Sequence, residues 1–141
     1  MKNLTLIFAS TALALLTAGA VQAADLKIIA NTSIGTSSIS ADELKAVFLA
    51  TKSSLSDGSH VEPVLEKGGP VHEAFVKEYL GKTDSALETY YRSLVFTGKA
   101  LMPKALGTDA EVEAYVAKTK GAIGYVSAVS GAASVKTLAV K

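Results

Sequence analysis

Four short apolar runs bounded by turn residues lie along the chain after residue 24, and each predicts a β-strand. The second run carries Pro63, which has no amide proton to donate. We therefore expect that strand to lie at a sheet edge or to contain a bulge. The four predicted strands span residues 25–31, 61–65, 122–126 and 135–140.

Four other segments place apolar residues three and four positions apart, the spacing of a helix with one buried face. Three of them begin with Ser or Thr followed three residues later by Glu, which is the capping-box pattern. The fourth begins at Pro70, a residue suited to the first helical position, and should end near Gly81. The capping pairs are Ser40 and Glu43, Ser85 and Glu88, and Thr108 and Glu111. The predicted stripes are Leu44, Val47 and Phe48; Val71, Ala74, Phe75, Glu78 and Tyr79; Tyr90, Tyr91 and Leu94; and Val112, Tyr115 and Val116.

The mixed order of strands and helices predicts an α/β layer fold, with helices packed on a small mixed sheet. The stretch 97–107 contains Gly98 and Pro103 and should be an irregular excursion within one domain. No internal repeat or linker divides the chain.

The first 23 residues have the pattern of a cleavable secretory signal peptide. Lys2 supplies the positive charge, residues 4–16 form the apolar region, and Val21-Gln22-Ala23 ends in the small residues that precede cleavage. Cleavage before Ala24 would leave one domain, residues 24–141, in a bacterial periplasm. The alternative is an uncleaved anchor, although about 13 apolar residues are short for a bilayer.

Removal of Lys2 leaves 13 basic and 13 acidic residues without a basic block, which argues against binding to nucleic acid or to an anionic membrane. The sequence contains no Cys, which excludes disulfides, thiol catalysis and a lipoprotein anchor. The hydrophobic core must therefore supply the stability of the exported protein.

Signatures of an enzyme, a metal site or a cofactor are missing from the sequence. The two histidines, His60 and His72, do not have the spacing of a metal-binding pair, and no Ser lies in a G-x-S-x-G elbow. We expect His60 to be solvated in a polar turn. His72, in the first turn of a helix, should be a surface residue or a ligand contact.

The strongest binding candidate is the junction between the second strand and its helix. Gly68 and Gly69 let a ligand approach the backbone, and a helix N-terminus presents free amides to an oxyanion. Lys67 and His72 add a charge and a donor, whereas Pro70 removes one amide. The alternative is a simple turn.

A second candidate is the hydroxyl-rich loop 31–38, in which Thr32 and Ser33 follow the carboxyl end of the first strand. Open α/β sheets bind ligands at such ends. The cluster of Tyr90, Tyr91 and Arg92 is interpreted as packing, with one Tyr buried and its neighbour at the solvent boundary.

Two stretches resemble phosphate-binding proteins of ABC importers. Residues 39–49 resemble that family's Leu-Ser-x-x-x-Leu-x-x-Ile-Phe-x-Gly pattern, with Ala50 where Gly is usual and Leu55 near the usual Trp. The string Gly-Ala-Ile-Gly-Tyr-Val at 121–126 matches the family directly. Further similarities, to the short single-lobe relatives, are Tyr91, the Phe-Thr-Gly-Lys string at 96–99, and Pro103.

The resemblance covers about residues 26–140 and implies a single lobe of the type 2 periplasmic-binding-protein class. The implied function is binding of phosphate or another small oxyanion, in or beside uptake through an ABC permease. Full-length receptors grip phosphate with an Arg-Ser-Asp-Gly-Ser-Gly-Thr type sequence. The matching residues 65–71 lack the Arg, the Asp and the hydroxyls, and Glu66 would repel an anion that it faced.

These departures leave a second hypothesis open. The lobe has then lost its ligand and serves as a protein–protein interaction module of the periplasm, marked by an exposed apolar patch. A homodimer is also possible, in which two lobes rebuild a two-walled cleft.

Overall fold

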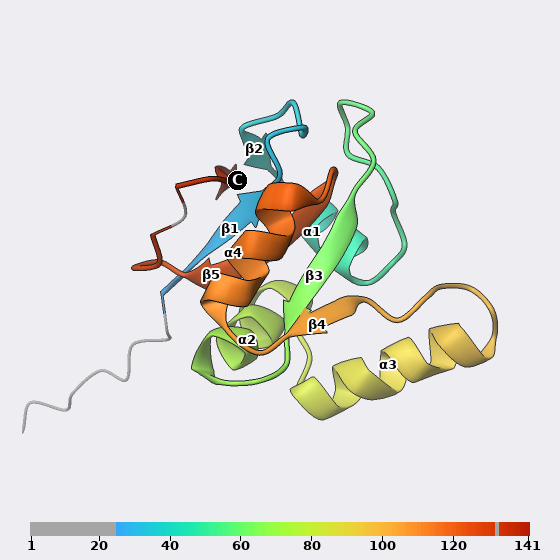
Figure 1. The fold of residues 1–141 in the computed structure, drawn as a ribbon. Helices are drawn as coiled ribbons and strands as arrows, with labels where there is room; N and C mark the ends of the chain where they lie inside the picture. Colours follow the sequence, from blue (N-terminus) through green and yellow to red (C-terminus); the bar gives the residue numbers. More distant parts are fainter. Residues whose placement is uncertain (1–24, 132) are drawn as a thin grey trace, which may run out of the picture.

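The computed structural model describes residues 25–131 and 133–141, and these residues form a mixed sheet of six strands flanked by helices (Figure 1). The predicted α/β layer fold is confirmed. The strands, in the sheet order β2-β6-β1-β5-β3-β4, are β1 (Leu26–Ala30), β2 (Ser38–Ile39), β3 (Glu62–Glu66), β4 (Lys104–Leu106), β5 (Ala122–Ser127) and β6 (Lys136–Val140). The helices are α1 (Ala41–Phe48), α2 (Pro70–Phe75), its π-helical continuation η1 (Val76–Leu80), α3 (Asp84–Phe96) and α4 (Asp109–Lys118).

Strand direction sends the loops to two opposite ends of the sheet. β3 runs parallel to β4 and β5, so the carboxyl ends of these three strands share one end. β1 runs antiparallel to β5, with Leu26 opposite Ser127 and Ala30 opposite Ile123. The loop after β1 therefore lies at the other end of the sheet from the loop after β3.

Helices cover both faces of the sheet. On one face α4 packs Val112 and Val116 against Val64, Val126 and Ile29. Figure 1 shows α4 crossing in front of the central strands. Because two valines of one helix pack against β-branched side chains on three strands, a small apolar core forms on this face of the sheet.

Aromatic rings dominate the larger core on the opposite face. Phe75 from α2 stacks on Tyr125 from β5 with ring centroids 3.9 Å apart. Phe48 from α1 meets Phe75 edge-on, with centroids 4.7 Å apart. All three side chains are fully buried, so this cluster fixes α1 and α2 on the sheet.

The four predicted strands are confirmed as β1, β3, β5 and β6. β2 and β4 were not predicted, because strands of two and three residues leave no alternation to detect. The irregular stretch after α3 is confirmed up to β4.

The expectation that the Pro63 strand lies at a sheet edge was wrong, because β3 lies between β5 and β4. Pro63 is tolerated because β4 pairs with β3 only from Val64 onward. The Glu62 amide donates to Gly121 O on the β5 side, so the Pro63 nitrogen faces the side where β4 has not yet begun.

Two of the three predicted capping boxes begin helices as expected. The hydroxyls of Ser40 and Thr108 accept the amides of Glu43 and Glu111. The box at Ser85 was wrong: the N-cap of α3 is Thr83, two residues earlier, and the helix begins at Asp84. The preceding helix ends at Gly81, and Thr83 is the first Ser or Thr after that turn, so its hydroxyl caps α3.

The helix from Pro70 to Gly81 is also confirmed, but its buried stripe differs from the prediction. The buried residues are His72, Phe75, Val76 and Leu80, whereas Val71 and Tyr79 are half-buried and Glu78 is exposed. His72, Phe75 and Val76 share one face of the helix at ordinary α-helical spacing, and the π-helical turn of η1 comes only after them. His72 is a core residue, contrary to its interpretation as a surface residue.

The predicted signal peptide, residues 1–23, lies outside the described residues. Among the residues that are described, no helix is long and apolar enough to cross a membrane.

Replacing Ala50 with glycine is expected to stabilise the protein by about 0.5–1 kcal/mol. Ala50 follows the end of α1 with φ of 59°, a left-handed conformation that costs an L-residue energy but suits glycine. Urea denaturation measures the change. Ala46→Gly, inside the same helix, is the matched control and should destabilise by about 1 kcal/mol; equal effects of both changes would contradict this account.

Candidate functional site

The junction between β3 and α2 is the exposed end of a buried strand. Glu66 ends β3 and is buried, whereas Lys67, Gly68 and Gly69 are exposed. Gly69 has φ of +94°, a conformation that favours glycine, and its carbonyl accepts the Glu73 amide. Among residues 25–131 and 133–141, the amides of Gly68 and Gly69 donate no hydrogen bond. Two backbone donors are therefore available at the carboxyl end of a parallel strand.

A hollow of about 250 Å³ lies beside this junction, between β3, α2, α3 and β4. Its inner surface is apolar and includes Leu87 and Tyr91. Its titratable lining consists of Lys67, His72 and the three carboxyl groups of Glu66, Asp84 and Glu88. The sequence predicted a site at the junction, but not the apolar wall that α3 supplies.

His72 joins three elements below the hollow. Its Nδ1 lies 2.5 Å from Tyr125 Oη, and its Nε2 lies 2.7 Å from Asp84 Oδ1. Tyr125 Oη also accepts the Glu66 amide at 3.0 Å. If the His72 ring accepts the Tyr125 hydroxyl proton at Nδ1 and donates from Nε2 to Asp84, both ring nitrogens and the Tyr125 hydroxyl have hydrogen-bond partners.

The burial of Tyr125 keeps its hydroxyl, the innermost group of the Tyr125–His72–Asp84 hydrogen-bond series, uncharged. Desolvation raises the pKa of the Tyr125 hydroxyl far above its ordinary value, so the phenol keeps its proton. His72 itself is only 3% exposed. It therefore positions α2 and α3 on β5 and presents no free nitrogen to a ligand.

Glu66 is a buried carboxyl at the end of β3. Burial, followed by a hydrogen bond to Asp109 and repulsion by its charge, raises the pKa of Glu66 to about 8. Within the described part of the chain, its Oε1 has no hydrogen-bond partner. Along β3 it lies two residues after Val64, so strand alternation places it on the sheet face that α4 covers. Near neutral pH Glu66 is mostly uncharged, which removes the repulsion expected from the sequence.

The loop after β1 does not join this site. Thr32 and Ser33 lie at the opposite end of the sheet, because β1 is antiparallel to β5. Ser33 Oγ accepts the Gly121 amide at 3.0 Å, and Asn31 Nδ2 donates to the carbonyls of Val116 and Ala117. The loop thus holds the end of α4, and Thr32 is exposed beside it.

The interpretation of the tyrosine pair as packing is confirmed. Tyr91 is buried and Tyr90 is half-buried. The Tyr90 hydroxyl donates to Leu49 O at 2.6 Å, and the Tyr91 hydroxyl donates to Phe48 O. These bonds fasten the first turns of α3 to the end of α1.

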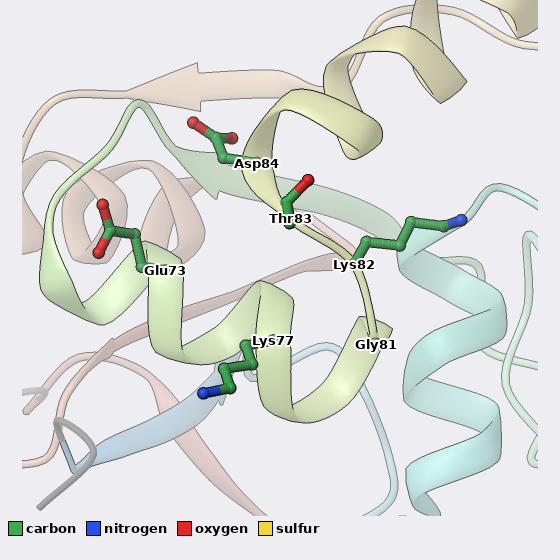
Figure 2. Close-up of a pocket in the computed structure, with 6 residues that line it drawn as sticks. All are labelled: Glu73, Lys77, Gly81, Lys82, Thr83 and Asp84. Atoms are coloured by element: carbon green, nitrogen blue, oxygen red, sulfur yellow. The ribbon is translucent and has the colours of Figure 1, made fainter.

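A wider hollow of about 570 Å³ lies on the other side of Asp84 (Figure 2). Glu73, Lys77, Lys82 and Asp84 line it. In Figure 2 the two lysine side chains extend in different directions, so their ammonium groups do not converge on one point. This hollow therefore offers a mixed surface without a cluster of one charge.

Solved structures of phosphate-binding receptors share this fold. The chain matches an ABC-type phosphate transport receptor from Vibrio cholerae with a TM-score of 0.64 and 15% identity, over 83% of this chain and 46% of the receptor. It matches a putative phosphate ABC transporter substrate-binding protein with bound phosphate from Clostridium perfringens with a TM-score of 0.63 and 15% identity, over 83% and 45%. For PstS from Borrelia burgdorferi the TM-score is 0.64 and the identity 12%, over 84% and 47%.

The chain therefore has the fold of part of a phosphate-binding receptor, a single lobe, and spans less than half the length of those proteins. The resemblance predicted from the sequence is confirmed at the level of the fold. No protein-family model and no curated protein sequence matches the chain.

Sequence reasoning missed Glu66 and Asp109 as a carboxyl pair, and Tyr125 as the partner of His72. Tyr125 lies within the 121–126 string that resembles the receptors, yet that pattern gives the residue no role. The pairings are between residues 43 and 53 positions apart, so no local spacing could reveal them.

Proposed function

We propose that this chain is an exported solute-binding domain that holds a small oxyanion, such as phosphate, at the junction between β3 and α2. The observation that carries the proposal is the pair of amides at Gly68 and Gly69, which donate no hydrogen bond within the part of the chain that the structure describes. They are exposed at the carboxyl end of β3, in a fold shared with phosphate receptors. Open α/β sheets hold ligands at such ends.

Each neighbouring residue has a distinct part in the proposed site. The Gly68 and Gly69 amides donate to the oxyanion, and the exposed Lys67 ammonium supplies the opposing charge. The protonated state of Glu66 keeps a negative charge away from the strand end. His72 holds α2 in place through Tyr125 and Asp84. Thr32 and Ser33 lie at the other end of the sheet and take no part.

The expected working place of the domain is the periplasm, after removal of residues 1–23, beside an ABC permease. The parallel with transport receptors supports binding without chemistry, so we propose no enzymatic activity. A single lobe encloses an ion on one side only, and we therefore expect weaker binding than a two-lobed cleft provides.

Titration calorimetry with inorganic phosphate tests the proposal. The native protein should bind phosphate with a dissociation constant below about 1 mM, and Lys67→Ala should weaken binding about tenfold because a charge-assisted contact is lost. Lys77→Ala, an exposed lysine on η1, is the matched control and should leave binding unchanged. Absence of binding at millimolar phosphate would overturn the proposal, as would equal losses in both variants.

A further inference from the structure

The hollow beside the junction of β3 and α2 is larger than a phosphate ion needs. It measures about 250 Å³ and lies between β3, α2, α3 and β4. For comparison, an apolar cavity of about 150 Å³ in a protein core holds a benzene molecule. A phosphate ion on the Gly68 and Gly69 amides is smaller than either space. The hollow therefore has room for a further part of a ligand that is attached to the phosphate.

The inner walls of the hollow are apolar. Leu87 and Tyr91 from α3 line it and are almost fully buried, so they form its floor. Met102 and Ala105, from the segment that leads into β4, line it as well, and Met102 is 54% exposed. Small-molecule sites typically combine such apolar walls with a few polar groups that fix the orientation of the ligand. The part of a ligand that enters this hollow should therefore be apolar.

Lys67 gives the hollow a cationic end. The Lys67 amide donates to Leu106 O at 2.8 Å, which fixes its backbone against β4, and the residue is exposed and lines the hollow. Gly68 and Gly69 follow it directly in the chain. The cation and the two free amides therefore lie at the same junction, next to the apolar walls. A molecule with an anionic group and an apolar group joined to it would match both parts.

The carboxyl groups in the lining do not require a cationic ligand. Asp84 Oδ1 accepts a hydrogen bond from His72 Nε2 at 2.7 Å, and Glu88 Oε1 accepts one from Arg92. Glu66 is mostly uncharged near neutral pH, because burial raises its pKa to about 8. The two ionised carboxylates still disfavour a second anionic group on the ligand. The lining therefore favours an uncharged apolar group.

We propose that this site binds a phosphate monoester with a compact apolar group, such as a phenyl ring, more tightly than it binds free phosphate. This inference rests on the proposed function, because it places the phosphoryl group at the junction amides and Lys67. A monoester keeps three terminal oxygens as acceptors for these donors. Its ester oxygen then leads the apolar group into the hollow, against the α3 floor and Met102.

Titration calorimetry at pH 7 compares phenyl phosphate with methyl phosphate, which has the same charged group without the ring. Phenyl phosphate should bind about tenfold more tightly, a ratio that corresponds to about 55 Å² of additional apolar surface removed from water. A carboxylate at the para position of the ring should reverse most of this gain. Equal affinities for the phenyl and methyl esters would overturn the inference and leave the proposed function standing. Absence of binding by both esters and by inorganic phosphate would overturn both.

Variants in the hollow show whether the ring lies there. Ala105→Leu places a larger side chain in the hollow and should reduce the ratio of phenyl to methyl phosphate affinity to about one. Met102→Ser should reduce the ratio about threefold, and it keeps the test available if Ala105→Leu fails to fold, because Met102 is exposed. Leu101→Ser is the matched control, since Leu101 is 89% exposed and does not line the hollow, and it should keep the native ratio. A tenfold ratio that persists in both hollow variants would place the ring elsewhere and contradict the inference.

Discussion

Replacing Gly121 with alanine is expected to destabilise the protein by about 3 kcal/mol or more, combining backbone strain with a steric clash. Gly121 has φ of +76°, and a Cβ atom there would lie 2.5 Å from the backbone oxygen of His60. The residue cannot move freely, because its amide donates to Ser33 Oγ and its carbonyl accepts the Glu62 amide. The loss is measured as the free energy of unfolding in urea.

Gly81→Ala separates the two causes. Gly81 also has a positive φ, +62°, but a Cβ atom there meets no other atom within 4 Å. It should cost only about 1 kcal/mol, the strain of the left-handed backbone. If the two variants lose the same stability, the contact with His60 is not the cause of the larger effect.

The native protein is expected to lose stability as the pH rises from about 4.5 to about 8. Replacing Glu66 with glutamine should remove most of this loss. The pKa of Glu66 is raised to about 8 in the fold, from an ordinary value of 4.5. Between these values the folded chain keeps a proton that the unfolded chain has released. The stability contribution of this proton is therefore fully present below pH 4.5 and is lost as the pH rises through 8.

The expected size of this effect is about 2–3 kcal/mol between pH 5 and pH 8, less than the full linkage value because β3 ends close to solvent. Urea denaturation at several pH values measures the slope for each protein. Glu73→Gln, an exposed carboxylate on α2, is the control and should keep the native slope. An unchanged slope in Glu66→Gln would show that the carboxyl ionises normally in the fold.

The sequence alone determined the local structure to a large extent. The hydroxyls of Ser40 and Thr108 cap their helices because the donors they satisfy lie three residues away. The 122–126 run forms the central strand β5 because it is continuously apolar, as a strand buried on both faces must be. The likeness of the 121–126 string to phosphate receptors also led to the correct fold.

Only the tertiary structure decided which distant groups meet. The antiparallel pairing of β1 separates Ser33 from Lys67, although both follow strand ends in the sequence. The packing of α2 between β5 and α3 buries His72 between Tyr125 and Asp84. Strand direction and helix rotation depend on packing between segments far apart in the chain. Local spacing contains no information about them, and so the sequence predicted the exposed loop at Gly68 and Gly69 but not the side chains around it.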